Sequence, residues 1–383
     1  MINNMIQTLM KKPLVARFVE DVYCKIPYYF MKGKAFNPLA VVLLVSYKCN
    51  LRCRMCFYYN DSEKENTNRL IKDRQKEELT LDQIKRLIED IRDMKAKVLT
   101  IHGGEPLLYP KIFEIADYAR KKGLLVNFVT NGTLITPEVA EKIVRVGICN
   151  ITFSIDGPES IHDKVRNVKG TFDKLIKGIG HLKELEKKGA KIPNLSLSTY
   201  ISAINQEKLV ELFEVIKDLG IKNWGSGLIT YNNAKLARST EKILGCSESH
   251  GQGNLENLED EVKNLKIETL LQQREKIKQK NKVYKLNVLF PSKNSIKNYY
   301  DSFYNEIDYC LYPWARTVVS PYGEVFPCIN LSMLNYSLGS IKENSIKDIW
   351  NSERYVAFRK ILRKNKLLPI CSKCCTISKI EKI

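Results

Sequence analysis

The chain has 383 residues, with 62 Lys and Arg against 43 Asp and Glu, and its formal net charge is +19. This length exceeds the roughly 250–300 residues at which one hydrophobic core stops growing, so we expect one large domain and a smaller one. At 44% hydrophobic and 27% charged, the composition argues against a disordered chain, and the positive charge favours an anionic partner: nucleic acid, a membrane surface or a phosphorylated substrate.

Residues 1–34 carry apolar side chains at helical spacing, among them Leu14, Phe18 and Val22, with basic residues around them. We expect a helix that caps the first domain or lies on a membrane surface, since an apolar stripe suits both. The longest apolar run, residues 39–45, is far below the ~20 residues of a transmembrane helix. With no secretory signal present, we expect a cytoplasmic protein, which in the second case contacts the inner face of the membrane.

From residue 41 to residue 230, strand-like and helix-like segments alternate. Such units predict parallel strands joined by right-handed crossovers, and six of them indicate an α/β fold of the partial (β/α)6 TIM-like barrel type. Functional groups in such folds gather at the carboxyl ends of the strands. The predicted strands are 41–47, 98–102, 125–130, 150–155, 195–201 and 224–230, and the predicted helices are 81–94, 111–122, 137–146, 171–188 and 206–219.

Cysteine, glycine and polar residues follow four of these strands at that end. Taken singly, most of these motifs are typical of turns and helix caps, but their joint placement indicates one common cavity. They are Cys49, Cys53 and Cys56 after the first strand, Gly103, Gly104 and Glu105 after the second, Thr130 and Asn131 after the third, and Ser154 and Asp156 after the fourth.

The three cysteines form a CxxxCxxC motif within eight residues. Thiolates bind zinc or iron–sulfur clusters, and three of them leave one coordination position open, as a catalytic centre requires. The chain has 11 cysteines, an odd number, which argues against a secreted disulfide framework and favours metal or redox use in a reducing compartment.

Together with the Gly103-Gly104-Glu105-Pro106 motif and the Ser154/Asp156 pair, this cysteine motif resembles the radical S-adenosylmethionine enzymes over residues 41–229. The resemblance implies a catalytic 4Fe–4S cluster on Cys49, Cys53 and Cys56. It further implies that S-adenosylmethionine chelates the open iron and is cleaved reductively to a 5′-deoxyadenosyl radical, which abstracts hydrogen from a substrate.

The same resemblance implies which residues contact the cofactor. Met55 departs from the family pattern, because the residue before the third cysteine is usually aromatic. The implied contacts are Gly103, Gly104 and Glu105 for the methionine part, Ser154 and Asp156 for the ribose hydroxyls, Arg166 for the carboxylate, and Thr130 and Asn131 as further candidates.

The alternation ends after residue 230, and we divide the chain into segments 1–38, 39–230, 231–305 and 306–383. Segment 231–305 is rich in charge and is typical of a solvated insertion or lid. Segment 306–383 resembles the auxiliary-cluster extension of the same enzymes, in the short Twitch form related to the SPASM domain. That resemblance implies one auxiliary 4Fe–4S cluster. Its expected ligands are Cys310, Cys328, Cys371 and Cys374.

Two features of this second site stay open on the sequence. The CxxC spacing suits a zinc ribbon-like site as well as a cluster, and Cys375 stands next to Cys374 as an alternative ligand. Because four protein thiolates would close the cluster, we expect it to transfer electrons rather than to bind substrate.

We therefore predict a radical S-adenosylmethionine enzyme whose reductant is a flavodoxin or ferredoxin. The basic charge and the N-terminal segment favour an anionic small molecule or lipid as substrate. A ribosomal peptide is the alternative, although the segment before Cys49 is short for a leader-binding domain. The non-enzyme alternative is a zinc- or cluster-binding regulator, but no nucleic-acid-binding signature is present, so we expect no nucleic acid.

Overall fold

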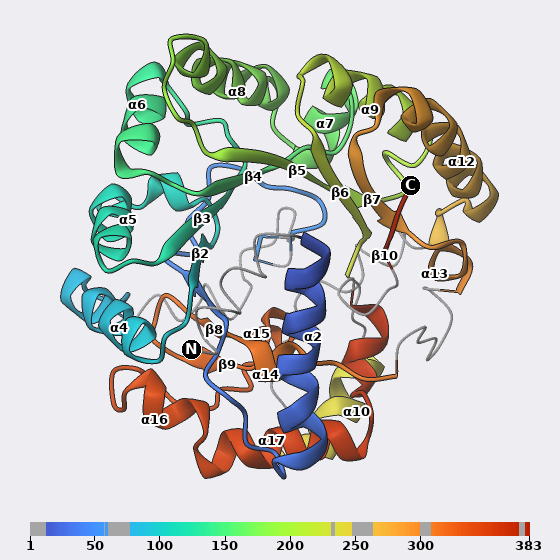
Figure 1. The fold of residues 1–383 in the computed structure, drawn as a ribbon. Coiled ribbons are helices and arrows are strands. Elements are labelled where there is room, and N and C mark those ends of the chain that lie inside the picture. The colour runs from blue at the N-terminus through green and yellow to red at the C-terminus, as the bar shows by residue number, and fades with distance from the viewer. Residues whose placement is uncertain are drawn as a thin grey trace.

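The computed structural model describes residues 13–56, 58–59, 77–230, 234–246, 263–298, 308–374 and 380–383. The described strands form one ten-stranded sheet in the order β10-β7-β6-β5-β4-β3-β2-β1-β8-β9 (Figure 1). Their bounds are β1 Ala40–Leu44, β2 Val98–His102, β3 Leu125–Thr130, β4 Asn150–Ser154, β5 Asn194–Ile201, β6 Asn223–Leu228, β7 Asn287–Pro291, β8 Arg316–Val319, β9 Val325–Phe326 and β10 Ile380–Lys382.

Strands β1 to β6 pair in parallel in chain order, with Val41 opposite Leu99 and Phe128 opposite Ile151. These four side chains have no exposed surface, as expected of parallel strands covered on both faces. The crossover helices lie on the outer side of the curved sheet (Figure 1). They are α4 Leu81–Asp93, α5 Ile112–Lys121, α6 Pro137–Val146, α8 Thr171–Lys187 and α9 Leu209–Asp218. The partial (β/α)6 barrel is confirmed.

Local signals explain where these helices begin. Thr80 forms a capping box with Gln83 ahead of α4, and the Thr136 hydroxyl accepts a hydrogen bond from the Val139 amide at the start of α6. One further helix, α7 (Glu159–Arg166), was not predicted, because its eight residues are mostly polar. It buries its C-terminal turn beside the cysteine loop.

The two edges of the sheet come from distant parts of the chain. Strand β8 lies parallel to β1, and β7 lies parallel to β6 with β10 antiparallel beyond it. Segment 231–305 therefore contributes a strand to the sheet, and the side chains of Val288 and Phe290 in β7 are fully buried. Helix α12 (Ile267–Tyr284) of the same segment packs against α9, and the segment also contains α10 (Ala234–Leu244) and α13 (Lys293–Asn298).

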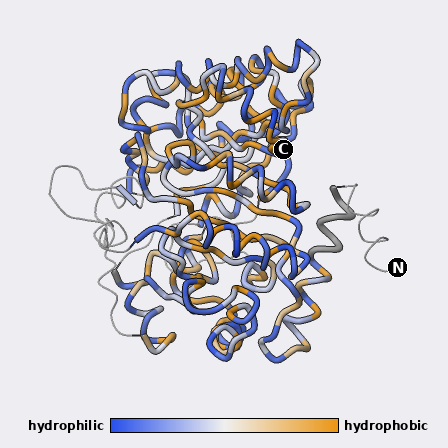
Figure 2. The backbone as a smooth tube through the Cα atoms, turned by 90° about the vertical axis from the view of Figure 1, so that its left-hand side faces the viewer, coloured by the Kyte–Doolittle hydropathy of each residue, from blue (hydrophilic) through white to orange (hydrophobic). Residues whose placement is uncertain are grey.

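The N-terminal helix α2 (Pro13–Phe30) packs against the C-terminal region. The ring centroids of Tyr28 and Trp314 lie 4.9 Å apart, and Trp314 belongs to α14 (Tyr312–Ala315). In Figure 2, hydrophobic and hydrophilic residues alternate along the chain, as amphipathic elements require. Within the described ranges, no helix is long and apolar enough to cross a membrane. The remaining elements are α15 Ile329–Met333, α16 Ile346–Trp350, α17 Glu353–Lys364 and the 3₁₀ turns η1 Pro106–Leu108 and η2 Pro369–Lys373.

Candidate active site

A cavity of about 200 Å³ lies at the carboxyl ends of the barrel strands. Its wall combines the cysteine loop, the ends of β2 to β6 and one part of the C-terminal region. Most lining side chains are apolar, and Arg166 is the only Lys, Arg, Asp or Glu among them. The lining residues are Cys49, Leu51, Cys53, Met55, Cys56, Tyr58, His102, Gly103, Gly104, Val129, Thr130, Asn131, Ser154, Arg166, Tyr200, Ile229, Thr230, Ile329, Asn330 and Cys374.

The cysteine loop presents all three of its predicted ligands to this cavity. Burial raises the pKa of Cys49 to about 12 and that of Cys56 to about 11, with the neighbouring cysteines adding to the rise. Thiolates at these positions therefore need a cationic partner, which a bound metal centre supplies. The described residues include no group of three or more such ligands arranged around one metal ion. The fit to a cluster rests on the thiol chemistry and on the shared cavity.

Hydrogen bonds hold this loop in place from two sides. The Arg54 amide donates to the Val165 carbonyl, 3.0 Å away, which joins the loop to the end of α7. On the other side, the Asn131 side-chain amide donates to the Asn50 side-chain oxygen at 2.9 Å. The positions of the three thiols are therefore set by the end of α7 and by the turn after β3.

Gly103 and Gly104 line the cavity, but the structure gives a second reason for glycine at both positions. A Cβ on Gly103 would lie 2.4 Å from the Ser46 carbonyl oxygen, and a Cβ on Gly104 would lie 2.2 Å from the Lys48 carbonyl oxygen. Gly103 also has φ +149°, a conformation that side chains rarely adopt. Close packing on the chain just before Cys49 thus requires these glycines, apart from any approach by a cofactor.

Glu105 lies behind the cavity wall. Its side chain is 1% exposed, and its carboxylate accepts hydrogen bonds from the Thr130 hydroxyl at 2.7 Å and the Asn131 amide at 2.8 Å. A third bond comes from the Leu107 amide at 3.1 Å. The carboxylate thereby fixes the turn after β3, and Thr130 and Asn131 rather than Glu105 face the cavity.

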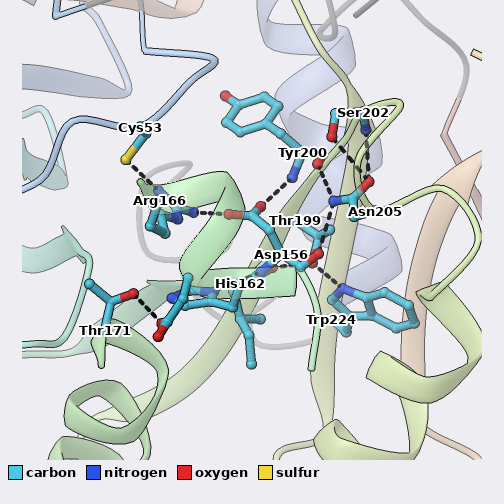
Figure 3. Close-up of polar contacts among 12 residues, drawn as sticks. Cys53, Asp156, His162, Arg166, Thr171, Thr199, Tyr200, Ser202, Asn205 and Trp224 are labelled. Atoms are coloured by element: carbon cyan, nitrogen blue, oxygen red, sulfur yellow. Dashed lines mark hydrogen bonds and ion pairs between the residues drawn. The ribbon is translucent and has the colours of Figure 1, made fainter. Parts of the chain in front are cut away.

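Ser154 lines the cavity, whereas Asp156 lies beneath it with no exposed surface. Arg166 connects Asp156 to the cysteine loop: one guanidinium nitrogen lies 2.5 Å from the Asp156 carboxylate, and the other donates to the Cys53 sulfur at 3.6 Å (Figure 3). Burial raises the pKa of the Asp156 carboxyl, and the Arg166 charge opposes that rise. The Arg166 Nε atom is buried without a hydrogen-bond partner, so it can still donate to an anionic group of a cofactor.

The four C-terminal cysteines are partly buried, and their charges affect one another. Burial raises the pKa of Cys371 well above its ordinary value, and the charges of Cys310, Cys328 and Cys374 raise it further. Such mutual effects require neighbouring thiols, and all four are soft ligands of the kind that iron–sulfur clusters use. Cys374 also lines the catalytic cavity, so the two cysteine sets border one space. Cys375 lies outside the described residues.

Sequence reasoning missed much of the cavity's apolar wall. Tyr200 and Ile229 lie at the ends of β5 and β6, so the strand-end rule could have found them. Ile329 and Asn330 belong to α15, far along the chain, and no local signal identifies them.

Comparisons with known proteins agree with this geometry. Residues 43–232 match the model of the radical SAM superfamily, and residues 310–375 match that of SPASM, an iron–sulfur cluster-binding domain. An AdoMet-dependent heme synthase of Methanosarcina barkeri is 29% identical over 313 residues, covering 78% of this chain and 80% of that protein. An Fe-coproporphyrin III synthase of the same organism is 31% identical, covering 51% of this chain and 45% of its own length.

One shorter sequence match and two solved structures are also similar to this chain. The mycofactocin maturase MftC of Mycolicibacterium smegmatis is 33% identical, covering 40% of this chain and 37% of that protein. SuiB of Streptococcus suis bound to S-adenosylmethionine superposes with a TM-score of 0.59 at 16% identity, covering 88% of this chain and 70% of that one. For anSMEcpe with bound AdoMet, the TM-score is 0.57 at 17% identity, and the shares are 84% and 82%. These two structures show a common fold.

Proposed function

Because the chain belongs to the radical S-adenosylmethionine superfamily and carries an iron–sulfur SPASM domain, we propose that it abstracts hydrogen from a small molecule or lipid with a largely apolar body. The observation that supports this substrate class is the cavity wall beside the cysteine loop. Tyr58, Tyr200, Ile229 and Ile329 present an apolar surface there, and Arg166, which is the one Lys or Arg of the lining, is already paired with Asp156. An anionic group on the substrate would therefore lie away from this wall.

The family implies S-adenosylmethionine and a catalytic 4Fe–4S cluster, which together supply one-electron cleavage and hydrogen abstraction when bound. We assign the cluster to Cys49, Cys53 and Cys56, whose thiols share the cavity. Gly103, Gly104, Thr130, Asn131, Ser154 and Arg166 would surround the cofactor, since they form the polar side of the same cavity. The apolar side excludes water from the reacting groups.

We assign the auxiliary cluster to Cys310, Cys328, Cys371 and Cys374, with electron transfer as its role. Burial raises the pKa of Cys310 to about 12, so this thiol too needs a cationic partner to ionise. Cys374 borders the cavity, which gives an electron a short path from the substrate to this centre.

The experiment that tests the reaction uses anaerobically reconstituted full-length protein with dithionite and S-adenosylmethionine. We expect release of 5′-deoxyadenosine, and its absence at every reductant level would overturn the assignment. Substrates are then tested by deuterium transfer into 5′-deoxyadenosine. The names of the heme and Fe-coproporphyrin III synthases make tetrapyrroles the first small molecules to test.

Peptide maturation is the second candidate, and the match to a mycofactocin maturase favours it. The same deuterium experiment separates the two classes. Transfer from a labelled peptide, with none from small molecules or lipids, would replace the small-molecule proposal.

We propose that the reductant is an acidic protein of the flavodoxin or ferredoxin class, because the chain carries a net charge of +19. The measurement is the rate of S-adenosylmethionine cleavage at rising salt. Salt should slow the reaction driven by flavodoxin and leave the one driven by dithionite nearly unchanged, since screening weakens attraction between proteins. Equal salt dependence would contradict the proposal.

We also propose that α2 contacts a membrane surface. Its residues Val22, Ile26, Tyr29 and Phe30 follow helical spacing and are 39%, 43%, 48% and 79% exposed. The test is flotation with anionic vesicles of the wild type and of Ile26→Ser/Phe30→Ser. The matched control is Val283→Ser on α12, whose apolar side chain is 75% exposed. Equal flotation of all three proteins would contradict membrane contact through α2.

A further inference from the structure

We propose that Asp156 and Arg166 form a buried positioning pair for the catalytic cluster, in which Asp156 orients Arg166 so that its guanidinium donates a hydrogen bond to the Cys53 sulfur. Asp156 then acts on the cluster through Arg166 and does not bind the ribose of the cofactor. The inference rests on the proposed ligation of that cluster by Cys53.

Arg166 contacts both Asp156 and the cysteine loop. Its guanidinium reaches the Asp156 carboxylate at 2.5 Å and the Cys53 sulfur at 3.6 Å, and the side chain is 10% exposed (Figure 3). Because the guanidinium is planar and its donors are fixed, the carboxylate on one side determines where the other nitrogen points. Arg166 ends α7, and the neighbouring Val165 carbonyl accepts from the Arg54 amide at 3.0 Å. Backbone and side chain thus hold the cysteine loop at the same place.

Asp156 is held in place by hydrogen bonds from its side chain and its backbone. Its other carboxylate oxygen accepts from the Tyr200 amide at 3.1 Å, and its backbone carbonyl accepts from the Asn205 side chain at 2.9 Å. Its own amide donates to the His162 ring at 3.2 Å. Asp156 is 0% exposed and does not line the cavity, whereas its neighbour Ser154 does. A fully buried carboxylate that lies between β5, α7 and Arg166 and does not line the cavity is not placed to meet a ribose hydroxyl there.

The two charged side chains should change the reduction potential of the cluster. A hydrogen bond or a positive charge at a cluster sulfur stabilises the reduced, more negative cluster and raises its reduction potential. Asp156 offsets the charge of Arg166 while keeping its hydrogen bond in place. The two residues should therefore shift the potential in opposite directions when each is changed alone.

The experiment measures the reduction potential of the catalytic cluster by electron paramagnetic resonance in reconstituted protein without S-adenosylmethionine. Arg166→Gln should lower the potential, because it removes the cation and its hydrogen bond. Asp156→Asn should raise the potential, because it leaves Arg166 without its counter-charge. Ser154→Ala is the matched control: it should weaken S-adenosylmethionine binding and leave the cofactor-free potential unchanged.

The two variants also separate this inference from the function on which it rests. A wild type that assembles no catalytic cluster would overturn the proposed function. An assembled cluster whose potential stays the same in both variants, or moves in one direction in both, would overturn the positioning pair, and weaker cofactor binding in Asp156→Asn with no change of potential would restore the ribose role. Where a variant does not fold, Arg166→Met and Asp156→Ser replace it with the same expected signs, since methionine also lacks the charge and the donors.

Discussion

The two cysteine sets of this molecule differ in how they meet the cavity. Cys49, Cys53 and Cys56 all line it, and their loop lies at the end of a parallel strand. Of the four C-terminal cysteines, Cys374 lines the cavity and the other three do not. Cys371 is enclosed by protein, and this burial raises its pKa well above the ordinary value. An open site on three thiols suits chemistry on a bound cofactor, and an enclosed site on four thiols suits electron transfer.

The two regions also differ in how they use a buried arginine. The first set has Arg166 beside Cys53, and Asp156 offsets that charge. In the C-terminal region, Arg359 is 0% exposed, and the contacts described for it are with carbonyls, an amide and aromatic rings rather than with a carboxylate. The barrel side thus places a paired cation at Cys53, while the C-terminal side uses a buried cation to join its elements.

The largest expected effect comes from Cys56→Ala. Removing one of three thiolates should abolish the catalytic cluster, and the release of 5′-deoxyadenosine should fall to background. Iron analysis should show that only the auxiliary iron remains. Retained cleavage of S-adenosylmethionine would show that the open site does not depend on this cysteine.

Cys371→Ala is the corresponding change in the enclosed set. We expect loss of the auxiliary iron, continued release of 5′-deoxyadenosine in the absence of substrate, and loss of product once a substrate is known. Iron content and the two turnover rates are measured on the same preparation. Unchanged product turnover would remove the electron-transfer role.

Gly104→Ala tests whether backbone packing holds the open site. The new Cβ would lie 2.2 Å from the Lys48 carbonyl oxygen, so the chain before Cys49 must move. We expect loss of catalytic iron with the auxiliary iron retained. Gly180→Ala in α8 is the control, because its Cβ meets nothing within 4 Å, and this change should stabilise the helix by about 0.5–1 kcal/mol. Full catalytic iron in Gly104→Ala would contradict the packing argument.

Arg359→Met tests the buried cation of the C-terminal region. Arg359 donates to the Pro313 carbonyl at 2.8 Å and to the Gly33 carbonyl at 3.4 Å. Leaving these acceptors unpaired should lower the free energy of unfolding by about 2–4 kcal/mol. Urea unfolding measures the loss, with Lys364→Met on the exposed side of α17 expected to stay within about 0.5 kcal/mol of the wild type. Equal effects of the two changes would contradict a structural role for the Arg359 guanidinium.

The sequence predicted the order and the type of the barrel strands and of their crossover helices, with bounds within about three residues, because buried Val, Ile and Leu runs and the caps at Thr80 and Thr136 are local signals. It also predicted that Cys49, Cys53 and Cys56 face one cavity, and all three line it. That they bind a cluster stays a prediction. The sequence did not predict α7, nor the entry of β7 and β8 into the sheet, because strand pairing over such separations depends on tertiary contacts.

Within the site, the sequence could identify polar residues at strand ends but not the direction in which each one points. Glu105 and Asp156 follow the strands as predicted, yet both are enclosed by hydrogen-bond donors behind the wall. That difference depends on α7 and on the turn after β3, which bring those donors from other parts of the chain.

The smallest expected effect is a difference between the two regions in how much acid lowers their stability. Burial lowers the pKa of His162 to about 3, so the unfolded chain binds a proton near pH 6.5 that the folded chain does not. Stability should therefore fall as the pH drops below about 6.5, by about 2 kcal/mol between pH 7 and pH 5. Urea unfolding of the cluster-free protein at both pH values measures this. His162→Asn retains an acceptor for the Asp156 amide and should lose the contribution of His162, while His102, whose pKa burial also lowers, keeps its own. The sequence has no histidine after His250, so acid should weaken the catalytic side first. Hydrogen exchange that rises equally in α7 and α17 on acidification would contradict this difference.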